Sequence, residues 1–328
     1  MKTTLLRSAA VLGGLMLGLL TTSADAAEWR GWNIHPADYP VSIGMEEFAK
    51  MVAEKTGGRI TMKVYHSAVL GDQPDAIEQV RLGAIEFGEF NLGPLGQVAP
   101  QANVVSLPFI FKSVDAMHAV MDGPIGEDIA AGLADKGLVA VGWYDSGARS
   151  FYDTKKAITQ PSDLEGMKIR VMNNDLFVGM IEAMGGNATP MPYGDVYQSL
   201  KNGVIDGAEN NYPSFESSGH YEAAGYYSLT EHLILPECLC INKALFDAQS
   251  PEDQQILREA GAASAALQRK LWADREEVSK AKVIAAGVQV NEVADKAPFQ
   301  AAMKPVYDKF IADNPDLEPL VRKIQAAQ

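Results

Sequence analysis

Short apolar segments with the alternation of β-strands follow one another along this chain of 328 residues, separated by helical patterns. This alternation limits the possible folds more than any other feature of the sequence. Strands are predicted at WRGWNIH, RITMKVY and AIEFGEF, and helices are predicted between them near residues 41–55 and 72–82. Such an order is typical of α/β proteins, so the sequence predicts an α/β fold.

The same pattern continues over the rest of the chain. Two helices are predicted within residues 113–136 and one within 175–184, and strands are predicted at LVAVGWY and MKIRV, with SFYDT and the turn PSDLEG between the strands. A long helical pattern over residues 251–284 is broken only by Gly261, and a last helix is predicted near residues 299–311. A chain of this size can form two packed cores, so we expect two lobes.

The first residues have the order of a secretory signal peptide. Lys2 and Arg7 provide positive charge, residues 9–20 are apolar, and residues 23–27 are mostly small. The apolar run is shorter than the roughly 20 residues that span a bilayer, and no later run is long enough either. We therefore expect residues 1–26 to be a signal peptide that is cleaved near Ala26, which leaves a secreted, soluble chain.

The charge of the chain excludes two classes of partner. The formal net charge is −14, and removal of Lys2, Arg7 and Asp25 with the signal peptide makes it one unit more negative. Such a chain is not expected to bind nucleic acid or anionic lipid. A small anion can still bind, because a few cations and backbone amides in a cleft set the local potential.

The two cysteines, Cys238 and Cys240, lie one residue apart in the apolar run LILPECLCI, which is predicted to be a buried strand. Strand alternation places both thiols on the same face. A disulfide between such close neighbours would be strained, so we expect two packed thiols. A redox or metal-binding role is the alternative.

One segment is echoed within the chain. Residues 80–91 (VRLGAIEFGEFN) and 200–211 (LKNGVIDGAENN) share glycine, isoleucine, glutamate and asparagine at matching positions. Each is predicted to be a helix that ends at glycine, followed by a strand with a polar end. Because ligands of open α/β sheets bind beyond the carboxyl ends of strands, we expect the polar ends at 89–91 and 209–211 to face each other across a cleft.

No catalytic motif is present in the sequence. It contains no G-x-S-x-G, H-E-x-x-H or G-x-G-x-x-G motif and no Walker loop, and its five histidines are scattered without ligand spacing. We therefore predict no catalytic residue, no metal ligand and no cofactor.

Two arginines have the surroundings of anion-binding residues. Arg149 follows an apolar strand in WYDSGARSFYD, and Arg170 lies in the strand MKIRV. A guanidinium group fits a carboxylate with two parallel hydrogen bonds, each contributing roughly 1.5–3 kcal/mol when shielded from water. The alternative is that each arginine pairs with a nearby acid such as Asp145, Asp153 or Asp175.

Several polar side chains at predicted strand ends and turns can bind hydroxyl groups, which is what a polyhydroxylated ligand requires. The alternative for each of them is a role in capping or turn formation. These residues are Asn33, His35, Glu89, Asn91, Tyr193, Asn210 and Asn211.

With these residues in place, the sequence resembles the solute-binding proteins of TRAP transporters, the tripartite ATP-independent periplasmic uptake systems. The matching segments are DLEGMKIRV, GAR at Arg149, MPYGDVYQSLKNGVIDGAEN and LTEHLILP, and the resemblance covers essentially all of the mature chain. It implies a two-lobed periplasmic-binding-protein fold with the ligand cleft between the lobes, crossing strands, and a long helix spanning both lobes.

The implied boundaries place residues 27–146 and about 239–280 in lobe 1, and residues 147–238 and about 281–328 in lobe 2. The resemblance also implies closure of the lobes around the solute without any chemical reaction. The expected partners are the membrane subunits of a TRAP transporter, and the carrier is expected to be a monomer in the periplasm.

In this family the arginine matching Arg170 clamps the ligand carboxylate, and the one matching Arg149 supports the same anion from a neighbouring strand. The resemblance also implies that Tyr193 stands where an aromatic residue packs on the ligand. Asn33, His35 and Glu89, from the first lobe, would contact the ligand groups farthest from the carboxylate. The complete set of predicted ligand-binding residues is Arg170, Arg149, Asn210, Glu89, Asn33, His35, Tyr193, Asn173 and Asn211.

The segments GWNIHPADYP, YDSGARSFYD and GAENNYPSFES resemble the subset that binds uronates and related sugar acids, such as glucuronate and galacturonate. Glu89 is expected to repel a second carboxylate and to accept hydrogen bonds from hydroxyls, which favours a monocarboxylate polyol over a succinate-like diacid. Asn173 and Asn174 stand where that subset has a run richer in glutamine and serine, and are expected to affect the preference.

Several alternatives to a uronate carrier follow from the same residues. The ligand of a carrier can instead be a C4-dicarboxylate, an aldonate or a 2-oxo acid, with or without an accompanying cation. A secreted enzyme acting on acidic sugars would need Glu89 and Glu209 to face each other as acid and base. A third alternative is a ligand-sensing module that reports to a receptor.

Overall fold

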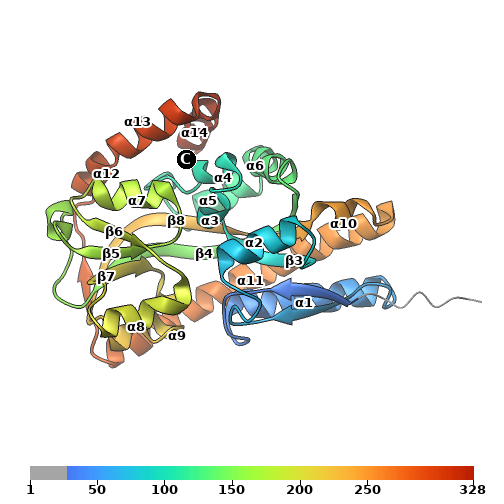
Figure 1. The fold of residues 1–328 in the computed structure, drawn as a ribbon, viewed down its shortest axis with the longest axis horizontal. Coiled ribbons are helices and arrows are strands. Elements are labelled where there is room, and N and C mark those ends of the chain that lie inside the picture. Colours follow the sequence, from blue (N-terminus) through green and yellow to red (C-terminus); the bar gives the residue numbers. More distant parts are fainter. Residues whose placement is uncertain (1–27) are drawn as a thin grey trace, which may run out of the picture.

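A computed structural model gives the structure of residues 28–328, so the predicted signal peptide and its cleavage site lie outside the described residues. Within this range one nine-stranded sheet forms the middle layer, and helices cover both of its faces (Figure 1). The strand order is β2-β1-β3-β8-β4-β7-β5-β6, and β9 pairs with β8. The predicted α/β fold is confirmed.

The strands are β1 (Glu28–Trp32), β2 (Thr61–Tyr65), β3 (Phe87–Asn91), β4 (Leu138–Asp153), β5 (Lys168–Val171), β6 (Asn187–Pro190), β7 (Gly207–Asn210), β8 (Tyr226–Asn242) and β9 (Gln289–Glu292). The α-helices are α1 (Pro40–Lys55), α2 (Gln73–Arg81), α3 (Leu92–Leu95), α4 (Pro100–Val104), α5 (Val114–Met121), α6 (Pro124–Ala134), α7 (Asp175–Glu182), α8 (Val196–Lys201), α9 (Tyr212–Ser217), α10 (Lys243–Asp247), α11 (Pro251–Ala285), α12 (Ala297–Ala302), α13 (Lys304–Asp313) and α14 (Glu318–Ala326). Among the described residues no helix is both long and apolar enough to cross a membrane.

Two long antiparallel strands, β4 and β8, connect the two halves of the sheet. The sequence separated LVAVGWY from SFYDT, but the structure joins them in β4, because register shifts at 140–142, 145–148 and 149–151 allow the polar stretch between them to bend within one strand. On one side β3 pairs with residues 237–241 of β8, and on the other β7 pairs with residues 150–153 of β4. Both halves of the sheet are therefore built on the same strand pair.

Three hydrophobic clusters fill the space between the sheet and the helices. The largest lies on the face covered by α2–α7 and α12–α14, and it includes Trp32, Phe177 and Phe299 from distant parts of the chain (Figure 1). On the opposite face, one cluster packs under α1 and α11 around Phe48, and another packs under α8 and α9 around Phe215. The largest cluster therefore extends across both halves of the sheet.

The long helix expected over residues 251–284 is confirmed as α11, which is continuous over 35 residues although Gly261 breaks the helical sequence pattern. This glycine has a packing role instead. A Cβ atom at Gly261 would lie 2.2 Å from the carbonyl oxygen of Val141, and one at Gly142 would lie 2.7 Å from the carbonyl oxygen of Gly261. The two glycines therefore allow the backbones of α11 and β4 to approach closely.

The C-terminal region contains more helices than predicted. The single helix expected near residues 299–311 is instead the pair α12 and α13, and α14 was not predicted. The second helix begins at Lys304, which is followed by Pro305; proline fits the first turn of a helix because its missing N–H would have no partner there.

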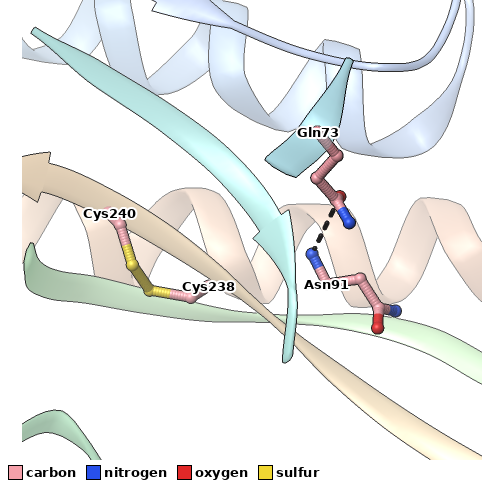
Figure 2. The surroundings of a disulfide bond; sticks show 4 residues. All are labelled: Gln73, Asn91, Cys238 and Cys240. Carbon is pink, nitrogen blue, oxygen red and sulfur yellow. Dashed lines mark hydrogen bonds between the residues drawn. A yellow bond between two sulfur atoms is a disulfide. The ribbon is translucent and has the colours of Figure 1, made fainter. Parts of the chain in front are cut away.

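Cys238 and Cys240 form a disulfide on β8 (Figure 2), so the expectation of two free thiols is wrong. The expectation that both lie on one face of a buried strand is confirmed, since both residues are fully buried. Their Cα atoms are 5.5 Å apart, which is within the ordinary range for a disulfide. In a fully extended strand, Cα atoms two residues apart are about 6.8 Å from each other. The backbone of β8 is therefore contracted at this point, which makes the bond possible.

Replacement of Gly261 by alanine tests the contact between α11 and β4. We expect Gly261→Ala to lower the free energy of unfolding by about 1–3 kcal/mol, because the added methyl group overlaps the Val141 carbonyl. Urea unfolding measures this change. The matched control is Gly179→Ala in α7, where nothing lies within 4 Å of the added Cβ; there the higher helix propensity of alanine should stabilise by up to about 1 kcal/mol. Equal changes in the two variants would contradict the close contact.

Candidate functional site

A cavity with a volume of about 60 Å³ lies where the polar ends of β3 and β7 approach the middle of the sheet. Most of the predicted ligand-binding residues contribute to it. Those that line the cavity are Arg170, Arg149, Asn210, His35, Tyr193 and Asn173.

Arg149, on β4, is buried and already paired with a carboxylate. Its Nε and Nη2 donate to the two carboxylate oxygens of Glu209 at 2.6 and 2.8 Å, which is the bidentate geometry that arginine favours. Its Nη1 donates to Oδ1 of Asn210 at 2.6 Å. The positive charge of Arg149 is therefore balanced within the protein, by Glu209 on β7 rather than by Asp145 or Asp153.

Arg170, on β5, is equally buried but has only a neutral partner. Its Nε and Nη2 both donate to the backbone carbonyl of Met191, at 3.1 and 2.9 Å. Within residues 28–328 its other N–H groups have no hydrogen-bond partner and no carboxylate pairs with it. Burial lowers the pKa of Arg170, yet a guanidinium group stays protonated in proteins. The cavity therefore contains one buried guanidinium group that no carboxylate of the described protein pairs with directly.

Asn210 and the aromatic residues shape the remaining walls. The Oδ1 atom of Asn210 is held by Arg149, which leaves its Nδ2 without a partner in the described part of the chain. Tyr193 donates to the carbonyl of Ser214 at 3.1 Å, and the ring of His35 lies edge-on to it. His35 stacks on Tyr39 with ring centres 3.8 Å apart. The polar wall thus faces an aromatic wall.

His35 is a neutral imidazole in this setting. Burial, together with the charge of Arg149, lowers its pKa to about 3. Its Nδ1 is buried without a partner among residues 28–328. His35 therefore adds a polar group to the cavity without adding a second positive charge near neutral pH.

Three of the predicted residues lie behind the cavity and do not line it. Asn33 donates to Ser42 at 2.6 Å and accepts from the backbone N–H of His35, so it orders the loop that carries His35. Asn211 caps α9 and donates to the carbonyl of Ser146 at 2.8 Å. Glu89 is buried against β8, with one oxygen unpartnered within the described residues. Asn173, in contrast, lines the cavity and is exposed.

The internal sequence echo corresponds to one local structure used twice. Asn91 ends β3 and its side chain caps α3, and Asn211 follows β7 and caps α9. Asn91 and Asn210 line the same cavity, as the echo predicted. The two glutamates of the echo do not face each other as a catalytic pair, because Glu209 is bound by Arg149 and Glu89 lies beside Glu237. This geometry does not favour the acid and base of a glycosidase.

Sequence reasoning missed four polar residues of the cavity, Gln73, Ser146, Ser214 and Glu237. Glu237 is the only charged residue in the apolar run LILPECLCI, and a lone acid in a buried strand is a signal that could have identified it. Ser146 lies in the irregular part of β4 between two strand segments, for which the alternating pattern gives no signal. Residues 28–328 contain no group of three or more side chains suited to a metal ion.

Comparison with known proteins gives a consistent result. The family model of DctP, described as bacterial extracellular solute-binding protein family 7, matches residues 32–314. A solved TRAP periplasmic solute-binding protein from Chromohalobacter salexigens, with bound D-glucuronate, is 62% identical, has a TM-score of 0.91, and is aligned over 92% of this chain and 100% of its own.

Two further solved TRAP periplasmic solute-binding proteins are similar to the same degree. The protein from Roseobacter denitrificans, with bound β-D-glucuronate, is 59% identical with a TM-score of 0.91 over 92% of this chain and 100% of its own. The protein from Sulfitobacter sp. NAS-14.1, with bound β-D-galacturonate, is 60% identical with a TM-score of 0.90 over 91% and 99%.

A pH series tests the neutral histidines that support the site. The Nδ1 atom of His220 shares a hydrogen bond with the hydroxyl of Tyr152 at 2.7 Å, and its ring lies edge-on to Tyr193. Burial together with the charge of Arg170 lowers the pKa of His220 to about 3. In the unfolded chain this histidine takes up a proton near pH 6.5, whereas in the folded protein it stays neutral down to about pH 3. Its effect on the free energy of unfolding is therefore constant above pH 6.5, and the free energy of unfolding falls as the pH is lowered from 6.5 toward 3. Between pH 6 and 4 the expected loss is about 1.4 kcal/mol per pH unit.

The variant His220→Asn isolates this contribution, because an asparagine amide does not titrate and can replace Nδ1 as the hydrogen-bond partner of Tyr152. Denaturant unfolding at pH 7, 6, 5 and 4 should show a smaller loss of stability in the variant, by about 1.4 kcal/mol per pH unit. Parallel pH profiles for the two proteins would contradict a neutral, buried His220.

Proposed function

Since the chain belongs to family 7 of the bacterial extracellular solute-binding proteins and is a TRAP solute-binding protein, we propose that its own solute is a hexuronate, D-glucuronate or D-galacturonate. Three similar proteins, 59–62% identical, hold one or other of these sugar acids. A hexuronate has one carboxylate and several hydroxyls, and the cavity offers one cation that no carboxylate of the described residues pairs with, together with polar groups that can bind hydroxyls.

The observation that carries this proposal is the state of Arg170. A buried charge without a counter-ion is costly, and an anionic ligand removes that cost while it forms charge-assisted hydrogen bonds. Arg149 cannot play the same part alone, because Glu209 already neutralises it. In the proposed complex the carboxylate binds the free N–H groups of Arg170, with the Nδ2 of Asn210 as a further donor and Arg149 supporting the anion from β4.

The other site residues take roles that match their positions. Tyr193 and His35 pack against the sugar ring, and Asn173 contacts it from the exposed side of the cavity. Asn33 and Asn211 act by positioning, since each orders a segment that lines or supports the cavity.

The proposed lobes are residues 27–146 with about 239–280, and residues 147–238 with about 281–328. Three hydrogen bonds between these lobes support closure around the solute. Tyr39 bonds the hydroxyl of Ser214 at 2.8 Å, Asn211 bonds the carbonyl of Ser146, and Asn174 donates to the carbonyl of Gly93 at 2.6 Å. Ligand binding would favour the closed form because it bridges the same two sides.

The family is extracellular. We propose that the protein is periplasmic and that residues 1–26 are the signal peptide that directs its export. The proposed partners are the membrane subunits of a TRAP transporter, which would receive the solute from the closed form. The chain contributes binding and conformational change, and no step of this scheme requires a catalytic group.

A ligand screen tests the identity of the solute. We expect D-glucuronate or D-galacturonate to raise the melting temperature of the purified mature protein, because a ligand that binds only the folded state stabilises it. Neutral D-glucose, which has the same ring but no carboxylate, is the matched control and should leave the melting temperature unchanged. A shift only with C4-dicarboxylates, aldonates or 2-oxo acids would keep the carrier function and reject the uronate.

Calorimetry on an arginine variant tests the proposed carboxylate contact. Arg170→Ala should weaken uronate binding at least tenfold, which corresponds to about 1.4 kcal/mol or more, whereas Arg170→Lys should lose less because it keeps the charge. The control is Arg322→Ala on α14, where an exposed arginine pairs with Glu318, and its affinity should equal that of the wild type. Unchanged affinity in folded Arg170→Ala would refute the role.

A further inference from the structure

Two carboxyl groups lie side by side at the cavity with no basic partner within the described residues. Glu89 is on β3 and Glu237 is on β8, and their residues are 1% and 5% exposed. In the antiparallel register Glu89 lies opposite Leu239, and Asn91 lies opposite Glu237. Glu89 and Glu237 are therefore diagonal neighbours on one face of the sheet, and Glu237 is the one that lines the cavity.

The hydrogen bonds around this pair indicate a shared proton. Glu237 Oε1 accepts from the amide of Asn91 at 3.3 Å. Glu237 Oε2 and Glu89 Oε1 are both buried and have no donor among residues 28–328. Two bare carboxylates so close together repel each other, whereas one proton between them supplies the missing hydrogen bond.

The surroundings place that proton on Glu89. Burial raises the pKa of Glu89 well above its usual value, and the charge of Glu237 and the hydrogen bond between the two groups raise it further. Burial also raises the pKa of Glu237, but hydrogen bonds with Glu89, Asn91 and Ser146 act in the opposite direction. Glu89 therefore donates, and Glu237 is the carboxylate.

The charges of the site require the same arrangement. Arg149 and Arg170 are positive, and Glu209 and Glu237 are negative, so the empty site is neutral when Glu89 holds a proton. An ionised Glu89 would make the site negative before an anionic solute arrived, which opposes binding.

We propose that Glu237 determines specificity by accepting hydrogen bonds from ligand hydroxyls and repelling a second carboxylate, and that Glu89 positions it through a shared proton. This inference rests on the proposed uronate function. It assigns to Glu237 the role that sequence reasoning gave to Glu89. Asn91 holds the Glu237 carboxylate in place, and the disulfide between Cys238 and Cys240 begins at the next residue of β8.

A selectivity ratio measured by calorimetry tests the proposal. The probes are D-glucuronate, which closes into a ring through its aldehyde carbon, and D-glucarate, in which that carbon is a second carboxylate and the chain stays open. Because both probes are measured on every variant, the effect of the ring is common to all the ratios. Wild-type protein should bind glucuronate at least 100-fold more tightly. Glu237→Gln removes the charge that repels a second carboxylate, so it should lower the ratio of glucuronate affinity to glucarate affinity at least tenfold. Glu89→Gln mimics the protonated acid, since its amide can still donate to Glu237, and should leave the ratio within about threefold of the wild type.

Two further measurements keep the proposal testable if Glu237→Gln folds poorly. Glu237→Asp keeps the charge but withdraws it by one methylene, so glucuronate binding should weaken at least tenfold while glucarate is still rejected. The infrared difference spectrum between the wild type and Glu89→Gln should show the band of a protonated carboxyl group that the variant lacks.

An unchanged ratio in folded Glu237→Gln would overturn the role of Glu237, and a narrowed ratio in Glu89→Gln would overturn the shared proton. Both results leave uronate binding intact. Failure of the proposed function is distinguishable, because the wild type would then bind no uronate at all.

Discussion

The antiparallel pairing of β4 with β8 is the constraint on which the rest of the structure depends. The two strands run through the whole sheet, and the short strands on each side attach to different parts of them. This pairing also carries the functional groups, because Arg149 lies on β4 and Glu237 on β8, each next to a neighbouring strand that supplies its partner. A shift of register by one residue would turn these side chains to the opposite face of the sheet.

The site combines buried charges of both signs, of which, within the described part of the chain, only Arg149 and Glu209 form an ion pair. The pair of Arg149 and Glu209 uses its charges on each other and fixes Asn210 as it does so. Arg170 is left with a neutral carbonyl as its partner. A buried cation without a paired carboxylate is costly, which is why the proposed carboxylate contact is assigned to Arg170 and not to Arg149.

Much of the fold and part of the site could be predicted from the sequence. Alternating patterns located most strands and the long helix, and Arg149 and Arg170 could be recognised because arginine in or beside a buried strand is unusual. Tertiary contacts decided the rest. Gly261 looked like a helix break but allows a close backbone contact, and the Cys238–Cys240 bond depends on a local contraction of β8. Whether Glu89 or its neighbour Glu237 lines the cavity depends on strand register, which no local pattern specifies.

The late position of β8 in the chain has a consequence for folding. Residues 87–91 of β3 pair with residues 237–241 of β8, a separation of about 150 residues, and such distant contacts slow folding. The groups β2-β1-β3 and β4-β7-β5-β6 are joined through β8, so the sheet cannot be completed before residues 226–242 are present. The two halves of the sheet therefore stay unconnected until the last long strand has been synthesised.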